Sequence, residues 1–60
     1  MFVIRLEREY GGQEPVTVWL KTANPVRFSD RGNAMKFETK GEAARVAAEA
    51  KLVGWVLEDA

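Results

Sequence analysis

Apolar and polar residues alternate at the start of the chain. Phe2, Ile4 and Leu6 share one parity, and charged residues take most positions of the other parity. A period of two is typical of a strand with one buried face. A glycine pair follows, and Val16–Lys21 is rich in residues that favour strands. The pattern therefore predicts a hairpin with a turn or short loop over 11–14.

The second predicted strand does not alternate so simply. Val16, Val18 and Leu20 share one parity, so they would face one layer. Trp19 has the opposite parity, and no single register can bury all of these side chains against one helix. Either the loop over Thr22–Asn33 covers the second face of the sheet, or that face is exposed and available to a partner.

Turn-forming residues divide the middle of the chain. Asn24-Pro25 marks a turn or a bulge, because proline lacks a backbone donor and restricts the residue before it. Val26–Phe28 again favours a strand, and Ser29–Asn33 is a cluster typical of turns. We therefore expect a long second strand that is broken near Pro25, followed by a hairpin into a third strand over Ala34–Glu38.

A helix is predicted to begin after Thr39. Thr39 followed three residues later by Glu42 has the spacing of a capping box, in which two backbone donors at the helix start are satisfied. Gly54 is placed to end the helix, and Trp55–Glu58 is long enough for a short last strand. Apolar positions recur at helical spacing on one face, namely Ala43, Val46, Ala47, Ala50 and Val53.

Together these elements predict an α+β fold and a single small domain over residues 1–60. The expected order is β-β-β-α-β, with a three-stranded antiparallel meander, one helix packed on one sheet face and a short C-terminal strand. Alanine dominates the predicted core face of the helix, so the strands must supply most of the core volume. The last strand is expected beside the first strand or beside the third. If the third and last strands join one sheet, the connection through the helix should be right-handed and the two strands should run parallel.

The composition restricts the chemistry. The 60 residues include no His and no Cys. The usual neutral-pH base, the best nucleophile and the commonest transition-metal ligands are therefore missing. We predict no enzymatic activity, no catalytic residue, no metal or other cofactor and no small-molecule substrate. Glu58 and Asp59 lack the spacing of a cation site and are interpreted as solvated charges.

The N-terminal apolar stretch bears on location. Arg5 and Glu7 interrupt it, so the pattern fits neither a signal peptide nor a membrane-spanning segment. We therefore expect a cytoplasmic protein that does not insert into membranes.

The first candidate site is the strand face that bears Trp19. Thr17 and Lys21 share its parity on the second strand, and Arg5 lies on the first strand. An aromatic side chain surrounded by charged ones is typical of a protein interface. These residues predict binding to a protein partner or to a second copy of the chain in a homo-oligomer.

The competing hypothesis is nucleic-acid binding. Nine basic residues balance nine acidic ones over the whole chain, but residues 21–45 contain six basic residues against three acidic ones. Arg27, Phe28, Arg31 and Lys36 would then supply phosphate contacts and a stacking surface. An ordinary solvated surface with charges of both signs explains the same residues more simply.

A local resemblance bears on both hypotheses. Residues Ala34–Ala43, which follow a strand containing Trp19, have the pattern strand, Phe-x-Thr-x-x-Glu-Ala and alanine-rich helix. This pattern resembles the arm-type DNA-binding domains of phage tyrosine integrases, and equally many small uncharacterised proteins of phages and prophages. The first resemblance implies a sheet that enters a DNA groove with Arg5, Trp19, Lys21 and Lys36. The second implies a phage or prophage accessory protein that binds a macromolecule. Our leading hypothesis is such a protein, which binds a protein partner or a second copy of itself through the strand face that bears Trp19.

Overall fold

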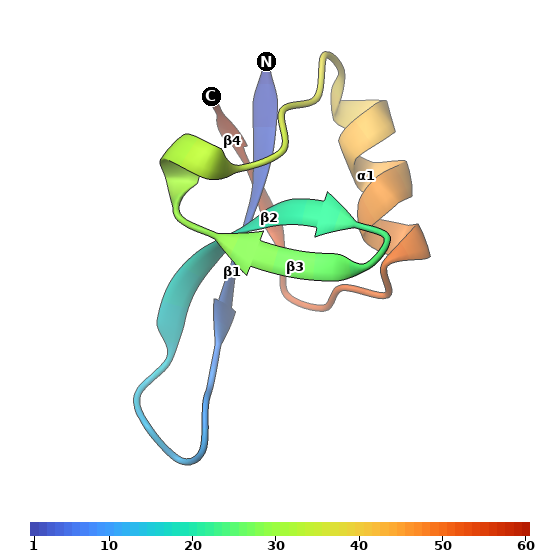
Figure 1. The fold of residues 1–60 in the computed structure, drawn as a ribbon. Coiled ribbons are helices and arrows are strands. Elements are labelled where there is room, and N and C mark those ends of the chain that lie inside the picture. The colour runs from blue at the N-terminus through green and yellow to red at the C-terminus, as the bar shows by residue number, and fades with distance from the viewer.

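The protein is a four-stranded antiparallel sheet with one α-helix against one face (Figure 1). The computed structural model describes residues 1–60. In chain order the elements are β1 (Phe2–Arg8), β2 (Val16–Ala23), β3 (Val26–Ser29), the short 3-10 helix η1 (Arg31–Asn33), α1 (Lys40–Glu49) and β4 (Val56–Asp59). The strand order across the sheet is β3-β2-β1-β4. The predicted α+β class and the β-β-β-α-β order are confirmed.

β1 and β2 form the hairpin that the sequence predicts. Their antiparallel register places Arg5 opposite Trp19. Gly11 and Gly12 have φ angles of +58° and +82°, which glycine adopts without a steric penalty, so the glycine pair makes the turn. The outer end of this hairpin projects away from the helix and from the rest of the sheet (Figure 1).

The predicted third strand over Ala34–Glu38 is wrong. The chain already turns back at Asn24-Pro25, whose peptide bond is cis, and β3 pairs with β2 immediately afterwards. The next turn cluster forms η1 rather than a hairpin, because the Asp30 side chain accepts a hydrogen bond from the backbone N–H of Asn33 at 3.0 Å. The sequence pattern allowed a turn at Asn24-Pro25, but it could not show that strand pairing would resume there.

A bend in β2 explains why Phe37 nevertheless lies beside the sheet. The register between β2 and β3 shifts at Lys21, which has no partner on β3 and forms a β-bulge. A bulge of this kind bends the strand. The edge of β1 next to Phe2 is bonded by another segment instead of β2. The backbone N–H of Phe2 donates to the carbonyl of Phe37 at 2.7 Å, and the N–H of Phe37 donates back at 2.8 Å. Phe37 is buried as expected, but the predicted strand is reduced to this bridge and to one hydrogen bond from the backbone N–H of Met35 to the carbonyl of Leu20 at 2.8 Å.

The predicted start of the helix is confirmed. The Thr39 hydroxyl accepts a hydrogen bond from the backbone N–H of Glu42 at 3.1 Å, and α1 begins at Lys40. This contact satisfies one of the backbone donors that a helix start leaves free. No helix in the structure combines the length and the apolar character needed to span a bilayer.

The predicted end of the helix is wrong. α1 ends at Glu49, and the residue that adopts the left-handed conformation is Lys51, with φ +58°, rather than Gly54. The N–H groups of Lys51 and Leu52 donate to carbonyls of the last helical turn at 3.1 and 3.0 Å, and this pattern closes the helix. Val53, predicted to lie on the core face of the helix, is therefore outside it and 87% exposed.

β4 lies beside β1 and runs antiparallel to it, with Val3 opposite Glu58 and Ile4 opposite Leu57. The expected parallel relation between the third and last strands has no counterpart, because Ala34–Glu38 does not form a strand. β4 instead occupies the edge of β1 that lies opposite β2. β3 and β4 consequently form the two outer edges of the sheet.

The core lies between the sheet and α1. Ile4 and Leu20 are fully buried, and so are Ala43 and Ala47 of the helix. The half-buried residues around them are Phe28, Met35, Val46, Leu52, Trp55 and Leu57. Large side chains therefore come mainly from outside the helix and small ones from the helix, as the alanine pattern predicts.

Candidate functional site

The residues predicted for protein binding lie around one strand pair. Arg5 of β1 is directly opposite Trp19 of β2. Because Ile4 and Leu20 face the helix, strand alternation places Arg5 and Trp19 on the opposite face of the sheet, which we call the Trp19 face. Thr17 follows the same alternation and is exposed, and Lys21 is exposed at the bend of β2. The structure therefore brings Arg5 and Trp19 together, with Thr17 and Lys21 on either side along β2.

A carboxylate occupies the centre of the Trp19 face. Glu58 of β4 accepts a hydrogen bond from the indole N–H of Trp19 at 2.9 Å and an ion-paired one from Arg5 at 3.0 Å. Arg31 of η1 also reaches Glu58, at 3.4 Å, and donates to the backbone carbonyl of Asp59. We call Arg5, Trp19, Arg31 and Glu58 the Glu58 cluster.

The Glu58 cluster favours the ionised carboxylate. The hydrogen bond from Trp19 is the largest influence that lowers the pKa of Glu58. The positive charges of Arg5 and Arg31 lower this pKa further, and partial desolvation opposes them. The side chains of the Glu58 cluster are thus already paired with one another, and η1, which follows β3, covers this part of the Trp19 face.

Sequence reasoning missed Glu58, which it interpreted as a solvated charge. The only local signal was the short strand pattern that ends the chain. The partners of Glu58 follow from the register that places it opposite Val3, and from η1, which approaches from a different part of the chain. Trp19 and Glu58 are 39 positions apart in the sequence, and their contact depends on the arrangement of the strands in the sheet.

The structure does not gather the four residues predicted for nucleic-acid binding into one surface. Phe28 packs against the core, and the Arg8 guanidinium covers its ring at 4.6 Å from the ring centroid. Arg31 is engaged with Glu58. Arg27 and Lys36 are exposed, on β3 and in the segment before α1. Arg27 and Phe28 are neighbours on a strand, so their side chains face opposite sides of the sheet.

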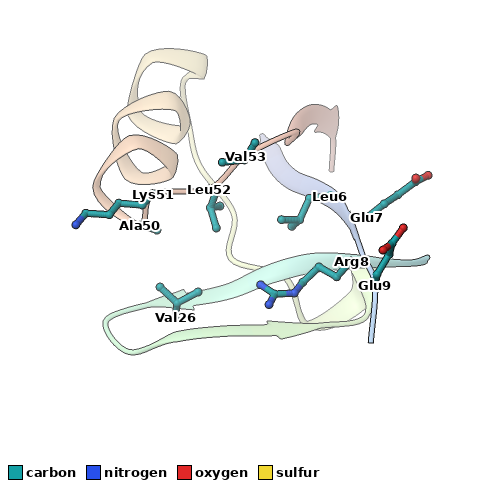
Figure 2. Close-up of a pocket in the computed structure, with 9 residues that line it drawn as sticks. All are labelled: Leu6, Glu7, Arg8, Glu9, Val26, Ala50, Lys51, Leu52 and Val53. Atoms are coloured by element: carbon teal, nitrogen blue, oxygen red, sulfur yellow. The ribbon is translucent and has the colours of Figure 1, made fainter. Parts of the chain in front are cut away.

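A different surface combines exposed apolar residues with a cavity. Two adjoining grooves of about 390 Å³ each lie between the end of β1 and the segment that follows α1. They share Leu6, Glu7 and Val53, and together we call them the edge groove. In Figure 2, Leu6 points toward Leu52 and Val53, whereas Val26 of β3 lines the opposite side. No pattern in the sequence indicates this groove, because the groove depends on where α1 ends.

The edge groove adjoins unpaired backbone. Phe2 exchanges its two backbone hydrogen bonds with Phe37 on the β2 side of β1, so even-numbered residues of β1 point their peptide groups to that side. Odd-numbered residues point theirs toward β4, and this pairing stops where Arg5 meets Val56, at the start of β4. The backbone N–H and C=O of Glu7 therefore face the edge groove without a strand partner.

Comparisons with known proteins provide no relative from which a function could be transferred. No protein-family model, no curated protein and no solved structure matches the chain. No group of three or more carboxylates converges in the structure, so its residues form no metal-ligating cluster. A functional proposal therefore depends on the geometry of the molecule.

Proposed function

We propose that this protein is a non-enzymatic binding module that holds an extended segment of a protein partner in the edge groove. The single observation that carries the proposal is an unpaired strand edge at Glu7 beside exposed apolar side chains. A segment that adds to β1 as a further strand would bond the free peptide groups of Glu7. Its side chains would cover Val53 and Val56, both of which are exposed.

The edge groove is favoured over the other open strand edge of the hairpin. β3 pairs with β2 only from Trp19 onward, so the outer edge of β2 at Thr17 is also free. Both cavities of the molecule adjoin β1, however, and neither is lined by Thr17. A strand added at Thr17 would find backbone partners without an apolar wall, and would therefore bury less hydrophobic surface.

The proposed surface differs from the Trp19 face predicted from the sequence. A partner on the Trp19 face would have to replace hydrogen bonds that Trp19 and Arg5 already make to Glu58. A partner in the edge groove displaces no such contact. The protein-partner class is the same as in the sequence-based hypothesis. Phage or prophage origin and a cytoplasmic location stay predictions from the sequence.

Peptide selection tests this proposal. A random peptide library would be selected on the immobilised full chain, and the selected peptides would be titrated into ¹⁵N-labelled protein. We expect amide shifts at Leu6–Glu9 and at Val53. Val53→Asp should abolish binding because it places a charge in the apolar wall. Val16→Asp is the matched control. Val16 is also an exposed valine, but it lies on β2 and lines neither groove, so this variant should bind normally.

Two outcomes would overturn the proposal. Selected peptides that shift the resonances of Thr17, Trp19 and Lys21 but not those of the edge groove would return the site to the Trp19 face. Binding of a mixed-sequence DNA duplex that is strong at about 50 mM salt and lost at about 200 mM salt would instead favour phosphate contacts. Arg27→Ala and Lys36→Ala would then be the variants that weaken it.

A further inference from the structure

We propose that the segment bound in the edge groove alternates aliphatic and basic residues, with its aliphatic side chains on the helix side of β1. This inference rests on the proposed function and specifies the chemistry of the partner. Three features support it. Side chains along β1 alternate between the two sides of the strand, and the carboxylates of Glu7 and Glu9 have no intramolecular partner. Two copies of the chain joined at this edge would also bring these carboxylates together.

The side chains at the end of β1 separate into two sets. Figure 2 shows Leu6 and Arg8 on the side of β1 that faces Val26 and the end of α1, whereas Glu7 and Glu9 point away from that region. A strand added to the edge has the same period of two. Its alternate side chains would therefore lie beside Leu6 and Arg8 or beside Glu7 and Glu9, whichever direction it runs.

The helix side of the edge accepts aliphatic side chains. Leu6 forms its base, and Leu52 and Val53 form one wall. Val53 is 87% exposed, so an aliphatic neighbour would bury apolar surface that is now in water. Arg8 is held over the Phe28 ring at 4.6 Å, so its aliphatic stem can be covered while its charge stays near solvent.

The other side of the edge accepts basic side chains. Both ion pairs of the molecule involve Glu58, so Glu7 and Glu9 are exposed carboxylates without a cation within 4.0 Å. A lysine or arginine directly opposite such a carboxylate on a neighbouring strand stabilises the pairing. An acidic side chain at the same place would be repelled.

The same charges argue against a second copy of the chain as the occupant. Two copies that joined their β1 edges about a two-fold axis would run antiparallel. Glu7 and Glu9 of one copy would then lie beside the same residues of the other, and four carboxylates would share one face of the new sheet. Like charges directly opposite one another destabilise strand pairing, so a different chain with basic residues fits the edge better.

Designed peptides test this inference. A fluorescein-labelled peptide of about four valine–lysine repeats, long enough for a typical strand, would be titrated with the full chain and followed by anisotropy. The control is a peptide of the same composition with its valines and lysines in separate blocks. We expect the alternating peptide to bind about tenfold more tightly, because the blocked order loses two cross-strand charge pairs and the continuous apolar face. A valine–glutamate repeat should not bind.

A charge exchange provides the second arm of the experiment. The double variant Glu7→Lys with Glu9→Lys should lose the valine–lysine peptide and bind the valine–glutamate peptide, because the sign of the exposed charges is reversed. Both positions are exposed, so circular dichroism should show an unchanged fold. N-methylation of alternate peptide nitrogens should abolish binding to the wild type, since an added strand needs its backbone donors.

The outcomes separate this inference from the proposed function. Equal binding of the alternating and blocked lysine peptides, or binding that survives N-methylation, would overturn the inference and indicate simple charge attraction. Library peptides that shift Leu6–Glu9 but lack basic residues would overturn the inference and leave the edge groove as the binding site. Failure of every peptide at the edge groove would overturn both.

Discussion

Lys51 is the one residue other than glycine with a positive φ, at +58°. The backbone needs this conformation, because it allows Lys51 and Leu52 to donate to the carbonyls of Ala48 and Ala47 and so close α1. Glycine is the preferred residue at such a position, since a Cβ atom crowds the following carbonyl in the left-handed region. The closure of α1 therefore carries a cost in local backbone strain at Lys51.

We expect Lys51→Gly to raise the free energy of unfolding by about 1 kcal/mol, because it removes this strain. Urea denaturation of the variant and the wild type would measure the change. Lys51→Ala is the control, since it removes the charge but keeps the Cβ atom, and it should leave the stability nearly unchanged. A loss of stability in Lys51→Gly would mean that the lysine side chain stabilises the fold by more free energy than the positive φ at this position costs.

Glu58 makes the stability of the fold depend on pH. Its pKa is lowered in the folded state, first by the Trp19 hydrogen bond and then by Arg5 and Arg31. A carboxyl group of this kind stabilises the fold above its pKa in the unfolded chain, about 4.3, and this stabilisation is lost as the pH falls through the lower folded-state pKa. The ionised cluster is therefore fully effective at neutral pH.

We expect Glu58→Gln to be less stable than the wild type at neutral pH and to approach it in stability below about pH 4, as the wild-type carboxylate becomes protonated. Urea denaturation at a series of pH values would measure the difference. The ¹H–¹⁵N resonance of the Trp19 indole should titrate with a midpoint below about 4.3 in the wild type alone. Glu9→Gln, which removes an exposed carboxylate without an ion pair, should show no comparable change.

The close approach of α1 to the sheet depends on its alanines. Ala43 and Ala47 have no exposed surface, and they contact the cluster around Ile4 and Leu20. A larger side chain at either position would force the helix away from the sheet or push core side chains out of their preferred rotamers. Ala48, by contrast, is exposed on the same helix.

Ala47→Leu should therefore lower the free energy of unfolding by about 1–3 kcal/mol, the usual cost of overpacking a filled core. Ala48→Leu adds the same atoms on the solvent side and should change the stability by less than about 0.5 kcal/mol. Thermal unfolding of both variants would compare them. Equal effects would show that α1 is not held close to the sheet by its small residues.

The molecule as a whole divides into a packed body and a projecting hairpin end. Only eight residues are buried, all of them hydrophobic, and none lies between Glu7 and Thr17. Ladder hydrogen bonds hold that outer part of β1 and β2, and no second layer covers it (Figure 1). Regions with few buried apolar contacts open at a small fraction of the global unfolding free energy.

Native-state hydrogen exchange should therefore separate the two regions. The amides of Arg8 and Val16 should exchange through local opening at about 1 kcal/mol or less, whereas those of Ile4 and Leu20 should require global unfolding. A bound edge peptide should slow the exchange at Glu7 and Arg8. Equal protection along the whole of β1 in the free protein would contradict this division.

Local features of the fold could be predicted from the sequence because the interactions behind them are short. The Thr39 cap joins residues three positions apart, and the glycine turn and the alternation of β1 depend on neighbouring residues. The helix start, the first hairpin and the order of the elements were therefore predicted correctly. The end of α1 was not, because the residue that closes the helix is a lysine, which carries no sequence signal for the left-handed conformation, whereas Gly54 does.

Tertiary structure decided which segments became neighbours. The sequence pattern predicts a strand both at Val26–Phe28 and at Ala34–Glu38. In the structure the first pairs with β2 beyond the bend at Lys21, and the second makes only a bridge to the edge of β1 at Phe2. The Glu58 cluster and the edge groove have the same origin. The physical reason is that a local pattern states which face of a strand is apolar, whereas the energy of pairing distant strands depends on every other pairing in the sheet.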